Sequence, residues 1–359
     1  MQYLRQTLLA LLLVCLSQFT IANEEQTNQS TEFDPLELIA HHIGDAHTWH
    51  VFSYTDTSEE SHHISIPLPI ILFYEGHLYT FMSSVFNHDN AIVKKGNTYF
   101  KLLHEKIYIT DAAGLIQYDE NHQILNKKPL DFSITRNVAS MWLSVLIIVS
   151  LFLAAAKKYK GKPKTPRGLQ SFLEPLILFV RDDIAISQIG KEKADRFMPY
   201  LLTLFFFIWI NNLIGLIPFF PGGSNLTGNI SLTMLLALIT FVVTNINGSK
   251  TYWKHIFVAP GIPGWVKIFL VPVEFIGIFT KPFALMIRLL ANITAGHIII
   301  LSLFSLIFVM KSLAIAPVSI IMALMMFMLE LLVAVLQAYI FTLLTALFIG
   351  MALIEDEHY

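Results

Sequence analysis

The sequence predicts an all-α polytopic membrane protein with about five membrane-embedded helical segments and a small, partly β extension at its N-terminus. Hydrophobic residues make up 55% of the 359 residues and charged residues only 14%, whereas about a quarter of an average soluble domain is charged. From position 138 onward the apolar residues form runs of about 20, the length that a helix needs to cross a bilayer.

Residues 1–22 are typical of a secretory signal peptide. Arg5 precedes a short apolar stretch over 8–16, and small residues lead to a cleavage site after Ala22. An uncleaved N-terminal anchor is the alternative. Cys15, the only cysteine, lies inside this segment, so the rest of the chain cannot form a disulfide.

Residues 23–135 are polar enough to form an exported extension. Apolar and polar residues alternate over 63–66 and 106–109, which predicts short strands, and turn-forming residues follow at 111–114. Several histidines suggest a metal site, but their spacing fits no standard zinc pattern, and we expect no bound metal or cofactor. These histidines are His41, His42, His47, His50, His62 and His63.

Residues 138–156 form the first predicted span. A basic cluster follows and should stay in the cytoplasm, which places the N-terminal extension in the periplasm. Two independent signals, the export signal and the basic cluster, therefore agree on the orientation. The cluster consists of Lys157, Lys158, Lys160, Lys162, Lys164 and Arg167.

The chain then continues with an amphipathic helix over 168–195, predicted to lie on the cytoplasmic surface. Spans are predicted over 200–217 and 230–245. An apolar segment ends at Thr280, and Pro282 is expected to restart the helix.

Two long helices are predicted at the end, over about 282–310 and 317–354. At 1.5 Å per residue they measure about 43 and 57 Å, longer than the bilayer core of about 30 Å, so we expect strong tilting. The acidic tail over 355–357 would then lie in the cytoplasm. No internal repeats are apparent, unlike in many secondary transporters.

Few ionisable residues interrupt these two helices, and each is a functional hypothesis because burying it in a membrane is costly. They are Arg288, His297 and Glu330, with the polar Gln337 beyond. Arg288 and Asn292 are four residues apart and share a helix face, whereas Arg288 and His297 are nine apart and point in opposite directions.

Antiparallel packing of the two helices brings His297 level with Glu330, and Gln337 level with Arg288. Histidine and glutamate can exchange protons, so their pair suits a proton relay. Arginine cannot lose its proton in a protein, so Arg288 offers only a fixed positive charge, which we expect to face a carboxylate of a partner.

Structural roles are the alternatives at each position. Arg288 can reach the membrane interface or form a structural pair, and His297 can be a hydrogen-bonded structural residue. Gln337 can simply join two helices. Asn211 and Asn212 can either line a water-filled path or cap the end of the second span.

Three segments together resemble the subunit a family of F-type ATP synthases. They are RLLANITAGH over 288–297, ELLVAVLQAYIF over 330–341 and NLIGLIP over 212–218. The resemblance covers about residues 136–354, and Glu274 falls where the family has an acidic residue, seven positions before Lys281.

The resemblance implies that Arg288 faces the rotating c-ring and separates two half-channels, with Asn292 and Gln337 supporting it. His297, Glu330 and Asn212 would form the periplasmic half-channel. For Glu274 the resemblance implies a place near the cytoplasmic exit.

The family's role is that of a non-catalytic stator subunit, which couples proton flow to rotation and ATP synthesis without a cofactor. Its partners are the c-ring, subunit b and the rest of the complex, in the bacterial cell inner membrane. Residues 136–359 would be the membrane domain. The coupling ion, H⁺ or Na⁺, stays open. The long periplasmic extension departs from the usual short segment and resembles that of Bacteroidetes-type relatives.

Two other classes of function are disfavoured. A stand-alone channel or transporter would need a counter-charge for Arg288 within its own membrane helices. An intramembrane hydrolase using His297 and Glu330 would need a metal or nucleophile motif such as H-E-x-x-H, and the sequence contains none.

Overall fold

A computed structural model describes residues 44–55, 61–86, 91–120, 123–159, 168–217, 220–258, 262–310, 312 and 314–354. All of them belong to one compact unit, Pro35–Tyr359. Several predicted features lie outside the described residues: the signal peptide with Cys15, His41 and His42, the basic cluster from Lys160 to Arg167, and the acidic tail over 355–357.

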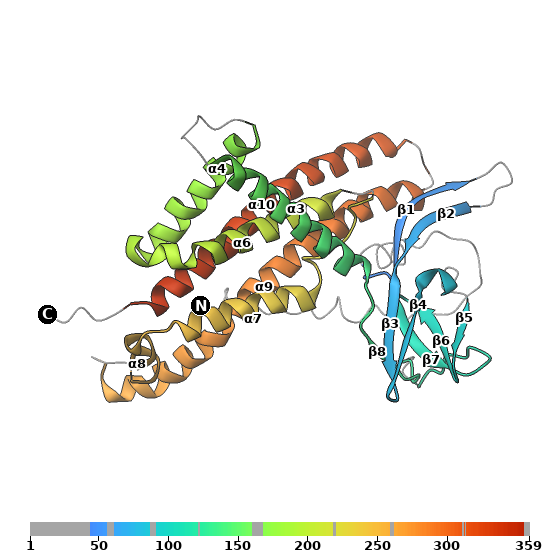
Figure 1. Ribbon diagram of the computed structural model, residues 1–359, viewed down its shortest axis with the longest axis horizontal. Helices are drawn as coiled ribbons and strands as arrows, with labels where there is room; N and C mark the ends of the chain where they lie inside the picture. Colours follow the sequence, from blue (N-terminus) through green and yellow to red (C-terminus); the bar gives the residue numbers. More distant parts are fainter. Residues whose placement is uncertain are drawn as a thin grey trace, which may run out of the picture. The chain divides into compact units, whose positions relative to one another are not determined.

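The first part of the described chain is a β region of short antiparallel strands (Figure 1). The predicted alternating segments fall within two of these strands, and the partly β character is confirmed. The strands are β1 (Thr48–Thr55), β2 (Ser61–Pro67), β3 (Pro69–Tyr74), β4 (His77–Met82), β5 (Ile92–Lys95), β6 (Thr98–Leu103), β7 (Lys106–Thr110) and β8 (Leu130–Asp131). β1 pairs with β2, β3 lies between β4 and β8, and β6 lies between β5 and β7.

A buried apolar cluster joins the two three-stranded sheets. Ile70, Leu72 and Phe81 come from the β4–β3–β8 sheet, and Val93 and Phe100 come from the β5–β6–β7 sheet. Burying an apolar side chain of this size contributes about 1.5–3 kcal/mol. The β region therefore has a core of its own.

Hydrogen bonds tie the β region to the first long helix, α3 (Arg136–Tyr159), which contains the predicted first span. The Asp45 carboxylate accepts hydrogen bonds from the Thr135 hydroxyl and the Asn137 backbone amide, at 3.0 and 3.1 Å. The Arg136 guanidinium donates to the Gly44 carbonyl at 2.6 Å. Asp45 thereby satisfies an N–H group at a helix start, where the backbone lacks partners.

The predicted amphipathic helix over 168–195 is not one element. The chain forms α4 (Leu169–Phe179), the π-helix η2 (Val180–Ile186) and α5 (Ser187–Ile189). This helical segment then ends at Gly190. Gly190 has a φ of 91°, which glycine adopts without the clash that a Cβ would cause. The second span, α6 (Lys191–Leu216), therefore begins earlier than the predicted position 200.

The predicted span over 230–245 forms the helix α7 (Ile230–Ile246), which passes as a membrane span only together with the helix that follows it. The side chain of Asn229 caps it by accepting a hydrogen bond from the Ser231 amide at 2.9 Å. The short helix α8 (Lys250–Val258) follows and is bent from α7 by 101°.

Two long helices complete the chain, α9 (Gly264–Val309) and α10 (Ala316–Ala352). The predicted restart at Pro282 is wrong, because α9 continues through it over 46 residues. Pro282 is buried in a helix that packs against α7, and proline is tolerated in membrane helices where neighbours compensate for the lost backbone bond. At 1.5 Å per residue, α9 and α10 are about 69 and 55 Å long.

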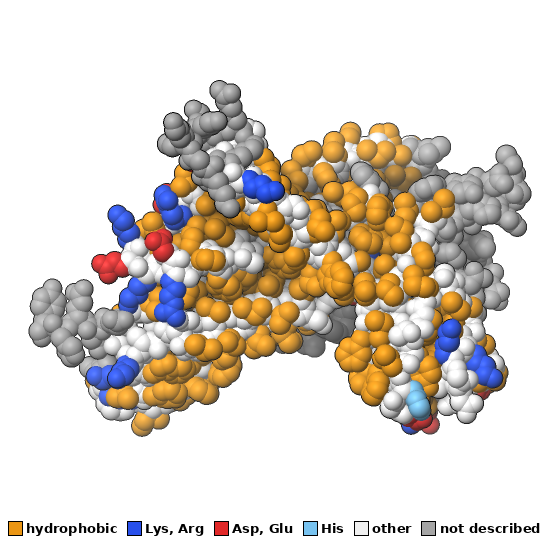
Figure 2. All heavy atoms as spheres, viewed as in Figure 1, with side chains coloured by type: hydrophobic (Ala, Val, Ile, Leu, Met, Phe, Trp, Pro, Cys, Tyr) orange, Lys and Arg blue, Asp and Glu red, His pale blue; other side chains and the backbone are white. Residues whose placement is uncertain are grey.

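Within the described ranges, four helices are long and apolar enough to cross a membrane, or up to five if the bent α7–α8 pair counts as one span. The predicted class, a polytopic helical membrane protein, is confirmed. Figure 2 shows mostly hydrophobic side chains along the helices, whereas charged side chains gather at the end where α8 and the start of α6 lie.

Candidate functional site

The candidate site lies where α9 packs against α10, which also packs against α6. Glu330 and Gln337 of α10 are polar, yet only 2% and 1% of their surface is exposed. Seven residues make about two helical turns, so both side chains lie on one face of α10. This face meets Gly296 and Asn292 of α9.

His297 of α9 and Glu330 of α10 form the predicted acid–imidazole pair. Nε2 of His297 lies 4.0 Å from Oε1 of Glu330, which is longer than a hydrogen bond. Neither carboxylate oxygen of Glu330 has a hydrogen-bond partner among the described residues. Because both side chains can bind and release protons, a small movement or one bridging water would let the pair transfer a proton.

Gly296 makes room for the Glu330 carboxylate. A Cβ at position 296 would lie 2.6 Å from Oε1 and 2.7 Å from Cδ of Glu330, closer than real Cβ contacts. The absence of a side chain at this position allows α9 to approach α10 at the level of the acid. Sequence reasoning missed this role, since a glycine inside an apolar helix carries no periodic signal.

Asn212 connects α6 to the same place. Its amide nitrogen donates to the Ala334 carbonyl of α10 at 3.3 Å, and its amide oxygen accepts from the Thr227 hydroxyl at 2.8 Å. Asn212 therefore joins three segments and does not cap the second span. Asn211 instead donates to the Phe207 carbonyl of its own helix at 2.7 Å.

The loop between α6 and α7 adds hydroxyl groups that the sequence alone did not reveal. Ser224 donates to Ser140 of α3 at 2.6 Å, and both residues are buried. A Cβ at Gly215 would lie 3.0 Å from the Ser224 carbonyl and 3.8 Å from Nε2 of His297. Gly215 of α6 therefore lies close to both the Ser224 carbonyl of the loop and the histidine.

Gln337 pairs with Asn292 rather than with Arg288. The Asn292 amide donates to Oε1 of Gln337 at 2.8 Å. We predicted an arginine–amide pair, and the structure places the amide partner one turn further along α9. The physical reason is register: helix spacing fixes which residues share a face but not how far one helix slides along another.

Arg288 is exposed and forms no hydrogen bond or ion pair with any described residue. Its neighbours in sequence, Ile287 and Leu289, are 41% and 0% exposed. A fixed positive charge on an apolar helix without an internal partner is costly in a membrane. The arrangement fits a counter-charge supplied from outside the chain.

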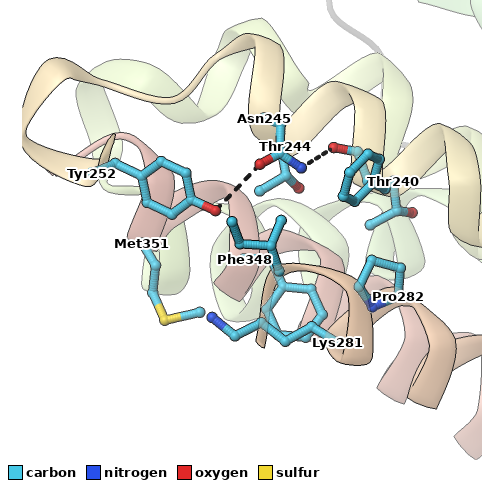
Figure 3. A pocket seen from close by; sticks show the side chains of 10 residues that line it. Thr240, Thr244, Asn245, Tyr252, Lys281, Pro282, Phe348 and Met351 are labelled. Carbon is cyan, nitrogen blue, oxygen red and sulfur yellow. Dashed lines mark hydrogen bonds between the residues drawn. The ribbon is translucent and has the colours of Figure 1, made fainter. Parts of the chain in front are cut away.

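A pocket lies between α7, α8, α9 and the end of α10 (Figure 3). The Tyr252 hydroxyl donates to Oδ1 of Asn245 at 3.4 Å, and Nζ of Lys281 lies 5.8 Å from the ring centroid of Phe348. Thr240 and Thr244 add further hydroxyls to the lining. Glu274 is exposed and is not among the residues that line this pocket.

A second histidine–carboxylate pair lies in the β region. Nε2 of His47 is 2.8 Å from Oδ2 of Asp131, and the Ser133 amide donates to Oδ1 of Asp131 at 2.8 Å. Burial alone would raise the pKa of Asp131, but the hydrogen bonds from His47 and Ser133 outweigh it and hold this pKa below its ordinary value. In the described part of the chain, no three His, Cys, Asp or Glu residues gather as metal ligands would.

Comparisons with known proteins match both parts of the chain. Residues 138–350 match the family described as "ATP synthase A chain". Residues 38–132 match a separate family, "Domain of unknown function (DUF8433)". The boundary between the two matches falls shortly before α3.

Individual relatives agree with the first match. The chain is 48% identical to ATP synthase subunit a of Chloroherpeton thalassium over 233 residues, which cover 64% of this chain and 69% of that protein. It is 44% identical over 254 residues to ATP synthase subunit a of Myxococcus xanthus, covering 69% of this chain and 82% of that protein. The protein of the same name from Chlorobium phaeobacteroides is 45% identical over 236 residues, 64% of this chain and 68% of its own length.

Proposed function

The chain belongs to the ATP synthase A chain family, and from this premise we propose that it is the proton-translocating stator subunit of an F-type ATP synthase. It is a multi-pass membrane protein and a non-catalytic component of its complex. Its proposed partners are the c-ring, subunit b and the rest of the ATP synthase. Its proposed task is to couple proton flow to rotation of the c-ring and hence to ATP synthesis.

The proposed periplasmic half-channel ends at His297 and Glu330. Protons would enter past the polar groups of Asn212 and the α6–α7 loop, and pass between the imidazole and the carboxylate. What supports this role is the 4.0 Å separation and the lack of hydrogen-bond partners at the Glu330 oxygens among the described residues, which leaves the carboxylate able to accept a proton. From this pair a proton would reach a carboxylate of the c-ring.

Arg288 is the proposed barrier between the two half-channels. It cannot pass a proton on, so it acts only through its fixed charge. Next to a c-ring carboxylate, that charge would favour the ionised form and drive release of the proton to the other side. Asn292 and Gln337 are proposed to support it, since Asn292 follows Arg288 by one turn of α9 and is hydrogen-bonded to Gln337, and neither amide titrates.

Glu274 and the pocket around Lys281 are the proposed route to the cytoplasm. The pocket has several polar groups in an otherwise apolar helix bundle, among them Thr244, Asn245 and Tyr252. We further propose that the chain lies in the inner membrane of a bacterium. Its β region would then lie in the periplasm and its C-terminus in the cytoplasm. Residues 1–22 are the proposed signal peptide, 23–135 the periplasmic extension and 136–359 the membrane domain.

The single observation that carries the proposal is that Arg288 is exposed on the lipid-embedded helix α9 and has no partner among the described residues. The test is ATP-driven proton pumping in inverted membrane vesicles. We expect Arg288→Ala to abolish pumping while the complex remains assembled. Arg196→Ala is a matched control, because Arg196 is an exposed arginine near the start of α6, outside both proposed paths.

Assembly is checked by co-purification of the c-ring and subunit b with the variant chain. Near-normal pumping by an assembled Arg288→Ala complex would refute the proposed role of the arginine. Failure of the wild-type chain to co-purify with a c-ring would refute the assignment as a stator subunit.

A further inference from the structure

The β4–β3–β8 sheet has two apolar faces. One face carries Ile70, Leu72 and Phe81 and packs into the core of the β region. Side chains alternate along a strand, so the intervening residues point to the opposite side of the sheet. A sheet with one solvated face normally places polar residues there.

The second face, here called the outer face, is instead almost entirely apolar. Strand register places Phe73 between Leu78 of β4 and Leu130 of β8. Phe132 lies beside Ile71, whose carbonyl accepts a hydrogen bond from the Phe132 amide at 2.9 Å. The outer face is defined by Ile71, Phe73, Leu78, Met82, Leu130 and Phe132, and it also includes the polar Thr80, which pairs with Ile71.

Most of these apolar side chains are exposed. Leu78, Leu130 and Phe132 are 63%, 61% and 64% exposed, and Phe73 and Met82 are 40% and 43% exposed. A contiguous apolar patch of this kind marks a surface that contacts something apolar.

Asp131 of β8 alternates to the opposite side of the sheet, where it bonds to His47, and Glu75 lies in the turn between β3 and β4. Other charged side chains lie on the second three-stranded sheet. Lys94 and Lys106 are exposed on the β5–β6–β7 sheet, and Lys128 lies over the ring of Tyr108 of that sheet. Figure 2 shows the same division, with hydrophobic side chains over the part of the β region where Figure 1 places β3 and β8. The β region is therefore amphipathic as a whole.

The chain holds the outer face near the start of a membrane span. Arg136, the first residue of α3, comes four positions after Phe132, so the two lie at most about 14 Å apart. The connection is also fixed by hydrogen bonds, from the Ile134 amide to the Pro69 carbonyl at 3.1 Å and from the Arg136 amide to the Ala46 carbonyl at 2.9 Å.

The helix α3 also exposes large apolar side chains. Trp142 and Leu146 are 62% and 64% exposed on this span, as expected of side chains that face lipid. The interfacial layer of a bilayer is about 5–8 Å thick on each side, and aromatic side chains favour it. The outer face is thus tethered within reach of that layer, next to a helix that is long and apolar enough to cross the membrane.

We propose that the outer face docks on the lipid surface of the leaflet that α3 enters at Arg136, with Phe73 and Phe132 as interfacial anchors. Docking removes exposed leucine and phenylalanine side chains from water and fixes the β region against the membrane. The occupant is the bilayer interface, and no protein partner is required.

The test uses spin labels on single cysteines in the full chain reconstituted in liposomes of phosphatidylcholine and phosphatidylglycerol. Cys15→Ala removes the only native cysteine. Labels are placed at Leu78→Cys and at Leu130→Cys. Leu115→Cys is the matched control, because Leu115 is a leucine with 60% exposure in a loop outside the outer face.

Collision of each label with oxygen, which concentrates in lipid, and with a water-soluble nickel complex is measured by electron paramagnetic resonance. We expect the oxygen-to-nickel ratio at positions 78 and 130 to be severalfold higher than at position 115. In addition, Leu78→Asp should lower the ratio at the position 130 label, because a carboxylate resists transfer from water.

Two results would overturn the proposal. Equal ratios at all three positions would mean that the outer face is in water. Low collision rates with both reagents at positions 78 and 130 would mean that a protein surface covers it, either another part of this chain or a second copy. Because only lipid and the full chain are present, these outcomes do not depend on the proposed function.

Discussion

The molecule contains two histidine–carboxylate pairs, one in the β region and one between two membrane helices, and their geometry differs. His47 and Asp131 are 2.8 Å apart, and Ser133 further holds the carboxylate. His297 and Glu330 are 4.0 Å apart, and no described residue forms a hydrogen bond with the Glu330 carboxylate. The same two chemical groups therefore form a hydrogen-bonded tie in one place and, in the other, a more widely spaced pair for which we propose proton exchange.

The largest difference should appear when the carboxylate of each pair is neutralised. We expect Glu330→Gln to lower ATP-driven proton pumping by about 100-fold or more, the range of a lost acid–base group. Asp131→Asn makes the same chemical change in the β region and should leave pumping nearly unchanged. Equal losses in both variants, measured with a pH-sensitive dye in vesicles, would remove the distinction between the two pairs.

The second prediction concerns the space that keeps the membrane pair open. Gly296→Ala places a Cβ 2.6 Å from Oε1 of Glu330, so the carboxylate or the helix must move. Overpacking of this kind costs about 1–3 kcal/mol, and pumping should fall clearly but less than in Glu330→Gln. Gly277→Ala in the same helix is the control, because a Cβ there meets nothing within 4 Å. Equal pumping in the two alanine variants would contradict the role given to Gly296.

A smaller effect is expected from the amide pair beside Arg288. Asn292→Ala removes the donor to Gln337, and leaving a buried amide unpaired costs about 1–3 kcal/mol. We expect a severalfold loss of pumping with normal assembly. Asn247→Ala is suitable for comparison, since the Asn247 side-chain amide donates to the Val243 carbonyl of its own helix. If Asn292→Ala pumped like that control, the amide pair would have no supporting role.

The smallest expected effect is the pH dependence of the β region. Hydrogen bonds hold the pKa of Asp131 below its ordinary value of 3.8. A carboxyl group with a lowered folded-state pKa contributes stability that is complete above the ordinary pKa and is lost as pH falls through the folded-state pKa. Amide exchange protection of β3 and β8, corrected for intrinsic rates, should therefore fall below about pH 4.

In Asp131→Asn, the protection should be lower near neutral pH and should no longer change with Asp131 ionisation. An unchanged acid profile in the variant would show that the His47–Asp131 pair does not stabilise the β region. The variant leaves the His297–Glu330 pair unchanged, so any difference in protection comes from the His47–Asp131 pair.

Helical periodicity explains how much of the site was predictable. His297 and Glu330 each interrupt an apolar helix, and antiparallel packing brings them to one level, so their pairing followed from spacing alone. The partner of Gln337 could not be predicted from spacing, because sliding α10 along α9 by one turn replaces Arg288 with Asn292 as its neighbour. Thr227 and Ser224 come from a loop. A loop sequence has no hydrophobic periodicity, so it does not predict where the loop packs.

The fold likewise has parts that the sequence predicted and parts that it did not. Long apolar runs predicted the spans, and alternation predicted β2 and β7. The continuity of α9 through Pro282 and the break at Gly190 depend on local packing and backbone angles that composition does not determine. The outer face of the β4–β3–β8 sheet likewise becomes visible only when the strand register places Leu78, Phe73 and Leu130 side by side.

The most direct test of the central claim, that Arg288 is a barrier between two proton paths, measures two quantities in the same vesicles. One is ATP-driven pumping, and the other is passive proton leak through the membrane sector. Removing the fixed charge in an assembled Arg288→Ala complex should abolish pumping and increase the leak above the wild-type level. Pumping close to wild type, with no added leak, would contradict the account.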